Sequence, residues 1–153
     1  MGCNFLYFCY YNFIMNKIKS ILAENNINKT KFRVDLLKLF YSKKSLSVLE
    51  ILDYFNSTVN KVTIYRSLKS FEKKCLIHKV PDSKNFTRYS LCNKNECKNG
   101  SHAHNHGHFI CYACEQTFCL ESIKVENTNQ LDGFKVENLK LIYEGYCNSC
   151  LNN

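Results

Sequence analysis

Two cysteine pairs constrain the second half of this chain more than any other feature. One is Cys111-Tyr-Ala-Cys114, and the other is Cys147-Asn-Ser-Cys150, close to the end of the chain. Two CxxC hooks separated by a loop the size of a small domain can wrap one Zn²⁺ in four thiolates, which is the donor set of a closed structural site. We therefore expect the C-terminal part to fold around zinc held by Cys111, Cys114, Cys147 and Cys150.

A run of histidines precedes the first hook. Four of the five histidines of the chain stand at His102, His104, His106 and His108. They are too many to belong to a four-thiolate site, so they predict a second, more adaptable metal site, where a sensing function would lie. On a strand, His106 and His108 would face the same side. The alternative interpretation is a flexible loop that collects metal. We expect His102 and His104 to be accessory.

The ten cysteines of the chain do not indicate a secreted disulfide framework. Four of the ten cysteines lie in metal-type hooks and nothing resembles a working signal peptide, so a reducing cytoplasm is the expected location. Residues 1–14 are apolar and uncharged, but this run is too short to span a bilayer as a helix. We expect an upstream start codon with Met15 as the true first residue, which makes residues 1–14 a non-native or disordered extension. A short interfacial anchor is the alternative; otherwise no membrane partner is expected.

The net positive charge lies entirely in the first half of the chain. Residues 1–83 carry 14 Lys and Arg against 6 Asp and Glu, whereas residues 84–153 carry 7 against 7. Such an asymmetry is expected if the first half binds a polyanion, although lysines on solvated helix faces would also produce it.

Residues 15–92 have the pattern of a winged helix-turn-helix. Apolar stripes predict four helices, which cover residues 16–25, 30–42, a segment that begins near Ser45 or Ser47, and 61–75. Two runs rich in β-formers follow at 76–80 and 86–92, separated by the turn residues 81–85. The fourth helix would enter the major groove and the hairpin would flank the DNA backbone.

The exposed side of that fourth helix supplies the expected DNA contacts. Arg66 can read a guanine edge or clamp a phosphate, and Tyr65 can touch a thymine methyl or a phosphate. The alternative for Tyr65 is core packing. The other expected DNA contacts, most of them to phosphates, are Thr63, Lys61, Lys69, Lys17, Lys19 and Arg88.

The second unit is expected to be α+β. Residues 93–105 are polar and irregular and read as a linker, so the unit spans residues 106–153. Two short strands are predicted around the first hook, a helix over 121–131, and a strand over 133–147 that leads into the second hook.

From Thr30 onward, four motifs together resemble the ferric uptake regulator family of metal-dependent repressors. Thr30-Lys-Phe-Arg33 is similar to its T-x-x-R motif, and Thr63-Ile-Tyr-Arg-Ser-Leu68 to its T-V-Y-R-x-L recognition helix. His106–Cys114 resembles the H-x-H-x-x-C-x-x-C junction, and Gly145–Cys150 the closing G-x-C-x-x-C. The resemblance implies a homodimer, in which an N-terminal winged helix binds a palindromic operator and a zinc-holding C-terminal domain dimerises. Metal occupancy would switch the affinity for DNA.

Within that family the chain looks most like the zinc uptake regulator branch, which implies control of metal uptake. That branch has a His on the first wing strand and a Cys ending the second as sensor ligands, matched here by His78 and Cys92. The iron and peroxide branches favour a His where this chain has Ser45, an acidic residue where it has Ser90, and an Asp where it has Gly107. A further departure is Cys75, where the family commonly has Gly; a slightly different turn is expected there.

The sensor site predicted from these matches bridges the two units. Thiolate and imidazole donors suit Zn²⁺, whereas Fe²⁺ sensing would favour more carboxylate oxygen. Iron or peroxide sensing remains the runner-up, with Fe²⁺ or another divalent metal at the regulatory site. The expected ligands are His78, Cys92, His106 and His108, with Cys119, His104 and Glu121 as alternatives.

Functions of other classes fit the sequence less well. The run His-Ala-His-Asn-His-Gly-His lacks the Asp of the H-x-H-x-D-H hydrolase motif, and no Ser-His-Asp set, P-loop or glycine fingerprint is present. We therefore expect neither an enzyme nor a small-molecule substrate. A zinc-storage or chaperone protein could use the same metal ligands, but it has no need of a basic helix-turn-helix.

Overall fold

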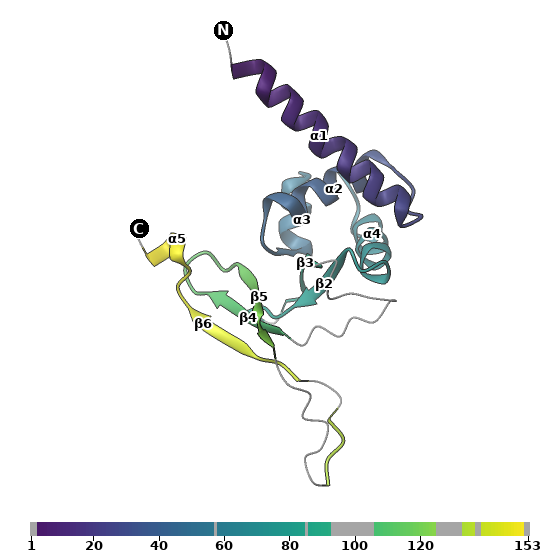
Figure 1. Cartoon of the computed structure of the whole chain (residues 1–153). Coiled ribbons are helices and arrows are strands. Elements are labelled where there is room, and N and C mark those ends of the chain that lie inside the picture. Colours follow the sequence, from purple (N-terminus) through teal and green to yellow (C-terminus); the bar gives the residue numbers. More distant parts are fainter. Residues whose placement is uncertain are drawn as a thin grey trace.

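The chain folds into two units joined through the wing of the first. The computed structural model describes residues 3–56, 58–84, 86–92, 106–124, 133–136 and 139–151. Helices gather in the N-terminal unit and a small sheet forms the C-terminal one, with the wing strands between them (Figure 1). The predicted α+β fold, a winged helix followed by a small α+β unit, is confirmed. The expected linker 93–105 lies outside the described residues.

The described part of the N-terminal unit contains four helices and a small sheet. Its elements are α1 (Cys3–Glu24), α2 (Lys31–Ser42), β1 (Leu46–Ser47), α3 (Val48–Tyr54), α4 (Lys61–Lys73), β2 (Ile77–Val80) and β3 (Arg88–Leu91). The strand order is β1-β3-β2, with all pairs antiparallel, and β2 and β3 form the wing.

Side-chain caps explain where three of these helices begin. The Thr30 hydroxyl accepts a hydrogen bond from the Arg33 N–H, and the Asn60 side chain accepts one from the Thr63 N–H. Ser47 and Glu50 form a capping box at the start of α3, so Ser47 rather than Ser45 is the cap. Each cap satisfies an N–H that has no partner inside the helix.

The apolar stripes predicted from the sequence meet in one core. Fully buried members come from all four helices and from β2: Ile18, Leu22, Leu36, Leu37, Phe40, Ile51, Ile64, Leu68, Phe71 and Ile77. Because α4 buries only one side in this core, its opposite side is presented to solvent.

In its described residues, the C-terminal unit is a three-stranded sheet with one short helix. Its elements are β4 (His106–Cys111), β5 (Thr117–Lys124), β6 (Ile142–Gly145) and α5 (Asn148–Leu151). β4 lies in the middle, antiparallel to β5 and parallel to β6. The predicted helix over 121–131 is wrong where the structure describes it, since residues 121–124 belong to β5, and the predicted strand over 133–147 is confined to β6.

Two further expectations differ from the structure. α1 begins at Cys3, not near residue 16, so the described part of the expected extension is helical, and its N-terminal end runs away from the rest of the unit (Figure 1). Cys75 has φ of 54°, so it adopts the left-handed conformation usual for Gly instead of a different turn. The Leu76 N–H donates to Phe71 O and the Cys75 N–H to Glu72 O, which is a Schellman motif ending α4. Within the described residues, no helix combines the length and apolarity needed to cross a bilayer.

Candidate metal centres and nucleic-acid interface

The four hook cysteines come together at one end of the second sheet. Cys111 ends β4 and Cys114 follows in the turn, while Cys147 immediately precedes α5 and Cys150 lies within it. Their sulfur atoms all lie within 4.8 Å of one another, and the Cys114 and Cys147 sulfurs are 3.9 Å apart. Two sulfurs on a tetrahedral zinc, at Zn–S of about 2.3 Å, would be about 3.8 Å apart, whereas a disulfide needs about 2.05 Å. The spacing therefore fits a Zn²⁺ ion.

Hydrogen bonds within this cluster change the pKa values of its thiols. The Cys147 N–H donates to the Cys111 sulfur at 3.3 Å. Hydrogen bonds from the Cys114 N–H and, to a smaller extent, from the Cys147 N–H lower the pKa of Cys111 to about 6. By contrast, the hydrogen bond with Cys147 raises the pKa of Cys150 to about 12. Since thiolates are the zinc ligands, binding would release protons held by such thiols.

A second cluster lies where the wing meets the second sheet. It consists of His78 from β2, His106 and His108 from β4, and Cys119 from β5, with ligand atoms within 4.8 Å of one another. His106 and His108 share a face of β4, and His108 is the direct cross-strand partner of Cys119. The Cys119 sulfur is 3.4 Å from His78 Nε2, close to the separation of about 3.6 Å that a tetrahedral zinc would impose on a nitrogen and a sulfur.

The imidazoles of this second cluster are buried, and burial favours the neutral form that binds a metal ion. The exposed fractions of His78, His106 and His108 are 3%, 5% and 9%. Burial, with a smaller contribution from His106, lowers the pKa of His108 to about 4, so its imidazole is neutral near pH 7. The buried His108 Nε2 has no hydrogen-bond partner among the described residues, which is costly for a polar atom unless something outside the protein binds it.

The cluster differs from the predicted set of sensor ligands in one cysteine. Cys119, expected only as an alternative, joins the cluster, while Cys92 lies outside it with its sulfur 3.5 Å from His78 Nδ1. The reason is backbone pairing: the Cys92 N–H donates to Leu76 O, which holds Cys92 beyond the end of β3 on the other side of the ring. Glu121 is exposed on β5, and His104 lies outside the described residues.

The expected DNA contacts on α4 share the solvent side of that helix. Tyr65 is 53% exposed, which argues against core packing. Lys61, Thr63, Arg66 and Lys69 are exposed on the same helix, as are Lys17 and Lys19 on α1. This surface of α4 is basic and faces away from the core.

Arg88 is a correction to the predicted DNA contacts. Its side chain is 5% exposed and forms ion pairs with Glu50 at 2.7 Å and Asp82 at 3.2 Å. A guanidinium engaged by two carboxylates in the interior has no surface to offer a phosphate. The sequence missed this role because Glu50 lies 38 positions away in α3, and no spacing rule connects the two.

Comparisons with known proteins agree with the geometry. The model of the ferric uptake regulator family matches residues 24–144. The ferric uptake regulation protein of Synechococcus elongatus is 25% identical over 143 residues, which cover 87% of this chain and 92% of that protein. That of Campylobacter jejuni is 26% identical over 153 residues, covering 93% and 91%.

Solved structures show the same fold. A zinc uptake regulator complexed with zinc and DNA matches with a TM-score of 0.64 at 22% identity, over 92% of this chain and 95% of that one. Holo XcZur matches with a TM-score of 0.62 at 22% identity, over 93% and 99%. The ferric uptake regulator of Helicobacter pylori, described as having three functional metal-binding sites, has a TM-score of 0.52 at 19% identity, over 93% and 94%.

Proposed function

This chain belongs to the ferric uptake regulator family of metal-responsive transcription regulators, which are not enzymes, and we propose that it is a zinc-sensing repressor. In this proposal it binds a palindromic operator as a homodimer and controls metal uptake. Residues 15–92 form its DNA-binding domain, residues 93–105 the linker and residues 106–153 the dimerisation domain. The observation that carries the proposal is the cluster between the two units, which consists of three buried imidazoles and one partly buried thiol. This group of His78, His106, His108 and Cys119 is called the sensor cluster below.

The donor set favours zinc over iron. The cluster offers nitrogen and sulfur and, within the described residues, no carboxylate, whereas Fe²⁺ and Mn²⁺ sites favour more oxygen. The sequence relatives named for ferric uptake favour the alternative, an iron sensor. We assign His78 Nε2, His106, His108 and Cys119 as the ligands. Cys92 is then an orienting neighbour of His78, because a ligating His usually has its other ring nitrogen held by a hydrogen bond.

The position of the cluster supplies a mechanism for the switch. His78 belongs to the wing, while the other three ligands belong to the second sheet. Zn²⁺ held by all four residues would favour one placement of the wing, and of the α4 surface behind it, over the others. A ligand shifts such an equilibrium only by its difference in affinity between the two arrangements. In this scheme the zinc at the hook cysteines contributes folding energy, not the response.

The edge of the second sheet supports the homodimer. Among the described strands β6 pairs only with β4, and three of its four residues are exposed. Ile142 and Tyr143 are 39% and 42% exposed, and Leu139 and Tyr146 beside them are 50% and 56% exposed. An exposed apolar edge strand is a liability unless another chain covers it. Sedimentation should therefore show a dimer, and Tyr143→Lys should weaken it; a monomer at micromolar concentration would remove this part of the proposal.

Cobalt substitution tests the ligand assignment. With zinc retained at the hook cysteines, Co²⁺ added to the sensor cluster should give a tetrahedral spectrum with a thiolate-to-cobalt charge-transfer band. Cys119→Ser should abolish that band, whereas Cys92→Ser should retain it and weaken binding about 10- to 100-fold. Cys75→Ser, which changes a partly buried thiol that belongs to neither metal cluster, is the matched control. A band lost only in Cys92→Ser would return the ligand role to Cys92.

Competition between metals tests the zinc assignment. Under anaerobic conditions the wild-type cluster should select Zn²⁺ over Fe²⁺ and Mn²⁺, and Cys119→Asp should shift the preference toward the oxygen-seeking metals. Selection of Fe²⁺ over Zn²⁺ by the wild-type cluster at comparable free metal concentrations would favour the iron-sensing alternative. A protein that binds zinc there but binds no DNA would be a storage protein instead.

A further inference from the structure

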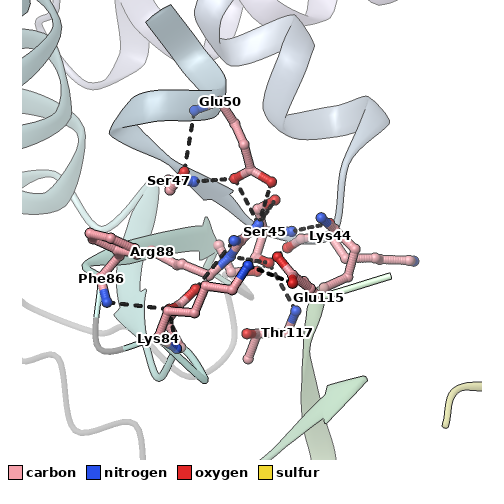
Figure 2. Close-up of polar contacts among 12 residues, drawn as sticks. Lys44, Ser45, Ser47, Glu50, Lys84, Phe86, Arg88, Glu115 and Thr117 are labelled. Carbon is pink, nitrogen blue, oxygen red and sulfur yellow. Dashed lines mark hydrogen bonds and ion pairs between the residues drawn. The ribbon is translucent and has the colours of Figure 1, made fainter. Parts of the chain in front are cut away.

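Arg88 is a buried cation whose partners come from three parts of the N-terminal unit. Its Nη2 donates to both carboxylate oxygens of Glu50 at 2.8 and 2.7 Å, and its Nη1 donates to Asp82 at 3.2 Å. Its Nε donates to the Ser45 hydroxyl at 3.2 Å. Arginine is almost never buried without such partners, so this group fixes the wing against the start of α3 (Figure 2).

The same Ser45 connects the arginine to the second unit. Its hydroxyl also accepts a hydrogen bond from the Thr117 N–H at 2.9 Å, and its own N–H donates to Gln116 Oε1 at 3.3 Å. The Thr117 hydroxyl in turn donates to Pro81 O, in the wing turn, at 2.8 Å. Ser45 and Thr117 are both fully buried. Three hydrogen bonds therefore join the units at a largely buried contact that uses no metal.

This contact lies beside the sensor cluster on the same strand. Thr117 and Cys119 are two apart on β5, so their side chains share one face of the sheet. The exposed pair between Lys84 and Glu115, at 2.6 Å, crosses the same junction, but both of its side chains are about half exposed and such pairs contribute little. The buried contact is the one that can hold the two units together.

We infer that Arg88, Ser45 and Thr117 form a metal-independent clamp, which keeps the winged helix against β5 when the sensor cluster is empty. Arg88 is the positioning residue of the clamp, because its guanidinium fixes the Ser45 hydroxyl toward the Thr117 N–H. The consequence of the clamp for DNA binding rests on the proposed function. The clamp limits how far the protein with an empty sensor cluster departs from the DNA-binding arrangement. It therefore limits how much zinc changes the affinity for DNA. Breaking the clamp should enlarge that change.

Hydrogen exchange at the Thr117 amide reports the clamp directly. In wild-type protein with zinc at the hook cysteines and an empty sensor cluster, this amide should be protected. Arg88→Lys keeps the charge but loses the forked geometry, and should speed exchange at Thr117 about fivefold or more, since one net hydrogen bond changes an equilibrium by about that factor. Lys84→Ala, which removes the exposed pair across the same junction, should leave Thr117 protected. Free exchange of Thr117 in the wild type would overturn the clamp.

A DNA-binding readout separates positioning from general destabilisation. Ser45→Ala is the milder variant, since it removes one hydroxyl and leaves Arg88 paired with both carboxylates. It should weaken DNA binding of the empty protein about fivefold or more while changing that of the zinc-loaded protein less than about twofold. Equal losses in both states would overturn the positioning role. If the wild-type protein shows no zinc response at all, the proposed function fails, whereas the exchange experiment, which uses neither DNA nor sensor metal, still decides the clamp.

Discussion

Acidification should destabilise the protein through His108 whenever the sensor cluster holds no metal. Burial lowers the pKa of this imidazole from 6.5 to about 4, so between these values the unfolded chain binds a proton that the folded chain excludes. Stability is therefore fully present above about pH 6.5 and falls as the pH drops toward 4. Integrated from about pH 7.5 to about pH 5, this single group removes on the order of 2 kcal/mol.

Urea denaturation at the two pH values measures this effect. The chain has no Trp, so unfolding is followed by circular dichroism, with zinc kept at the hook cysteines and the sensor cluster stripped by a mild chelator. His108→Gln cannot take up the proton, so it should lose about 2 kcal/mol less than the wild type over the same interval. The titration of Glu50 does not contribute to the difference in stability between about pH 7.5 and about pH 5. Its burial would raise its pKa, but hydrogen bonds from Ser47 and Arg88 lower it overall, so its contribution is lost only below about pH 4.5.

An equal loss of stability in the wild type and in His108→Gln would refute the reasoning, because His108 would then not be buried as a neutral group. Zinc supplies a second check. Since the metal competes with the proton for the same imidazole, the affinity of the cluster for Zn²⁺ should fall as the pH decreases. An affinity independent of pH between about 7.5 and 5 would contradict a neutral imidazole ligand.

Three further substitutions have clear expected outcomes. Cys147→Ser should lower the zinc content by one ion per chain and unfold the second unit, as seen by loss of dispersed amide resonances, because structural zinc contributes folding energy outright. Cys75→Gly should raise the free energy of unfolding by about 0.5–1 kcal/mol, measured in urea, since φ of 54° strains any residue with a Cβ; a decrease would show that the thiol packs usefully. Asn60→Ala should lower it by about 1 kcal/mol by removing the cap of α4, and no change would deny the cap.

The local patterns of the sequence predicted most of the N-terminal fold. The stripe of Ile64, Leu68 and Phe71 identified the buried side of α4, and with it the exposed side that carries Tyr65. The strands of the wing followed from their β-forming residues and the turn between them. These features depend on periods of 3.6 and 2 residues within one element, which a sequence displays directly.

The differences arose where distant segments meet. The position of Cys119 depends on the pairing of His108 with Cys119, and that of Cys92 on a bond to Leu76; neither follows from local periodicity. Residues 121–124 lie in a strand because β4 pairs with Leu120 and Lys124 on either side of a bulge, which overrides their local preference. Arg88 was predicted to contact DNA from the surface, whereas the fold places Glu50 and Asp82 beside it as ion-pair partners.

The central claim is that metal bound at the sensor cluster determines the affinity of the protein for DNA. One binding measurement tests this claim most directly. A palindromic duplex is first selected from random DNA by the zinc-loaded protein, and its dissociation constant is then measured with the sensor cluster loaded and stripped, zinc at the hook cysteines being retained in both. The loaded protein should bind roughly 5- to 150-fold more tightly, and Cys119→Ala should bind weakly under both conditions. Equal affinity of the loaded and stripped wild-type protein would contradict the account.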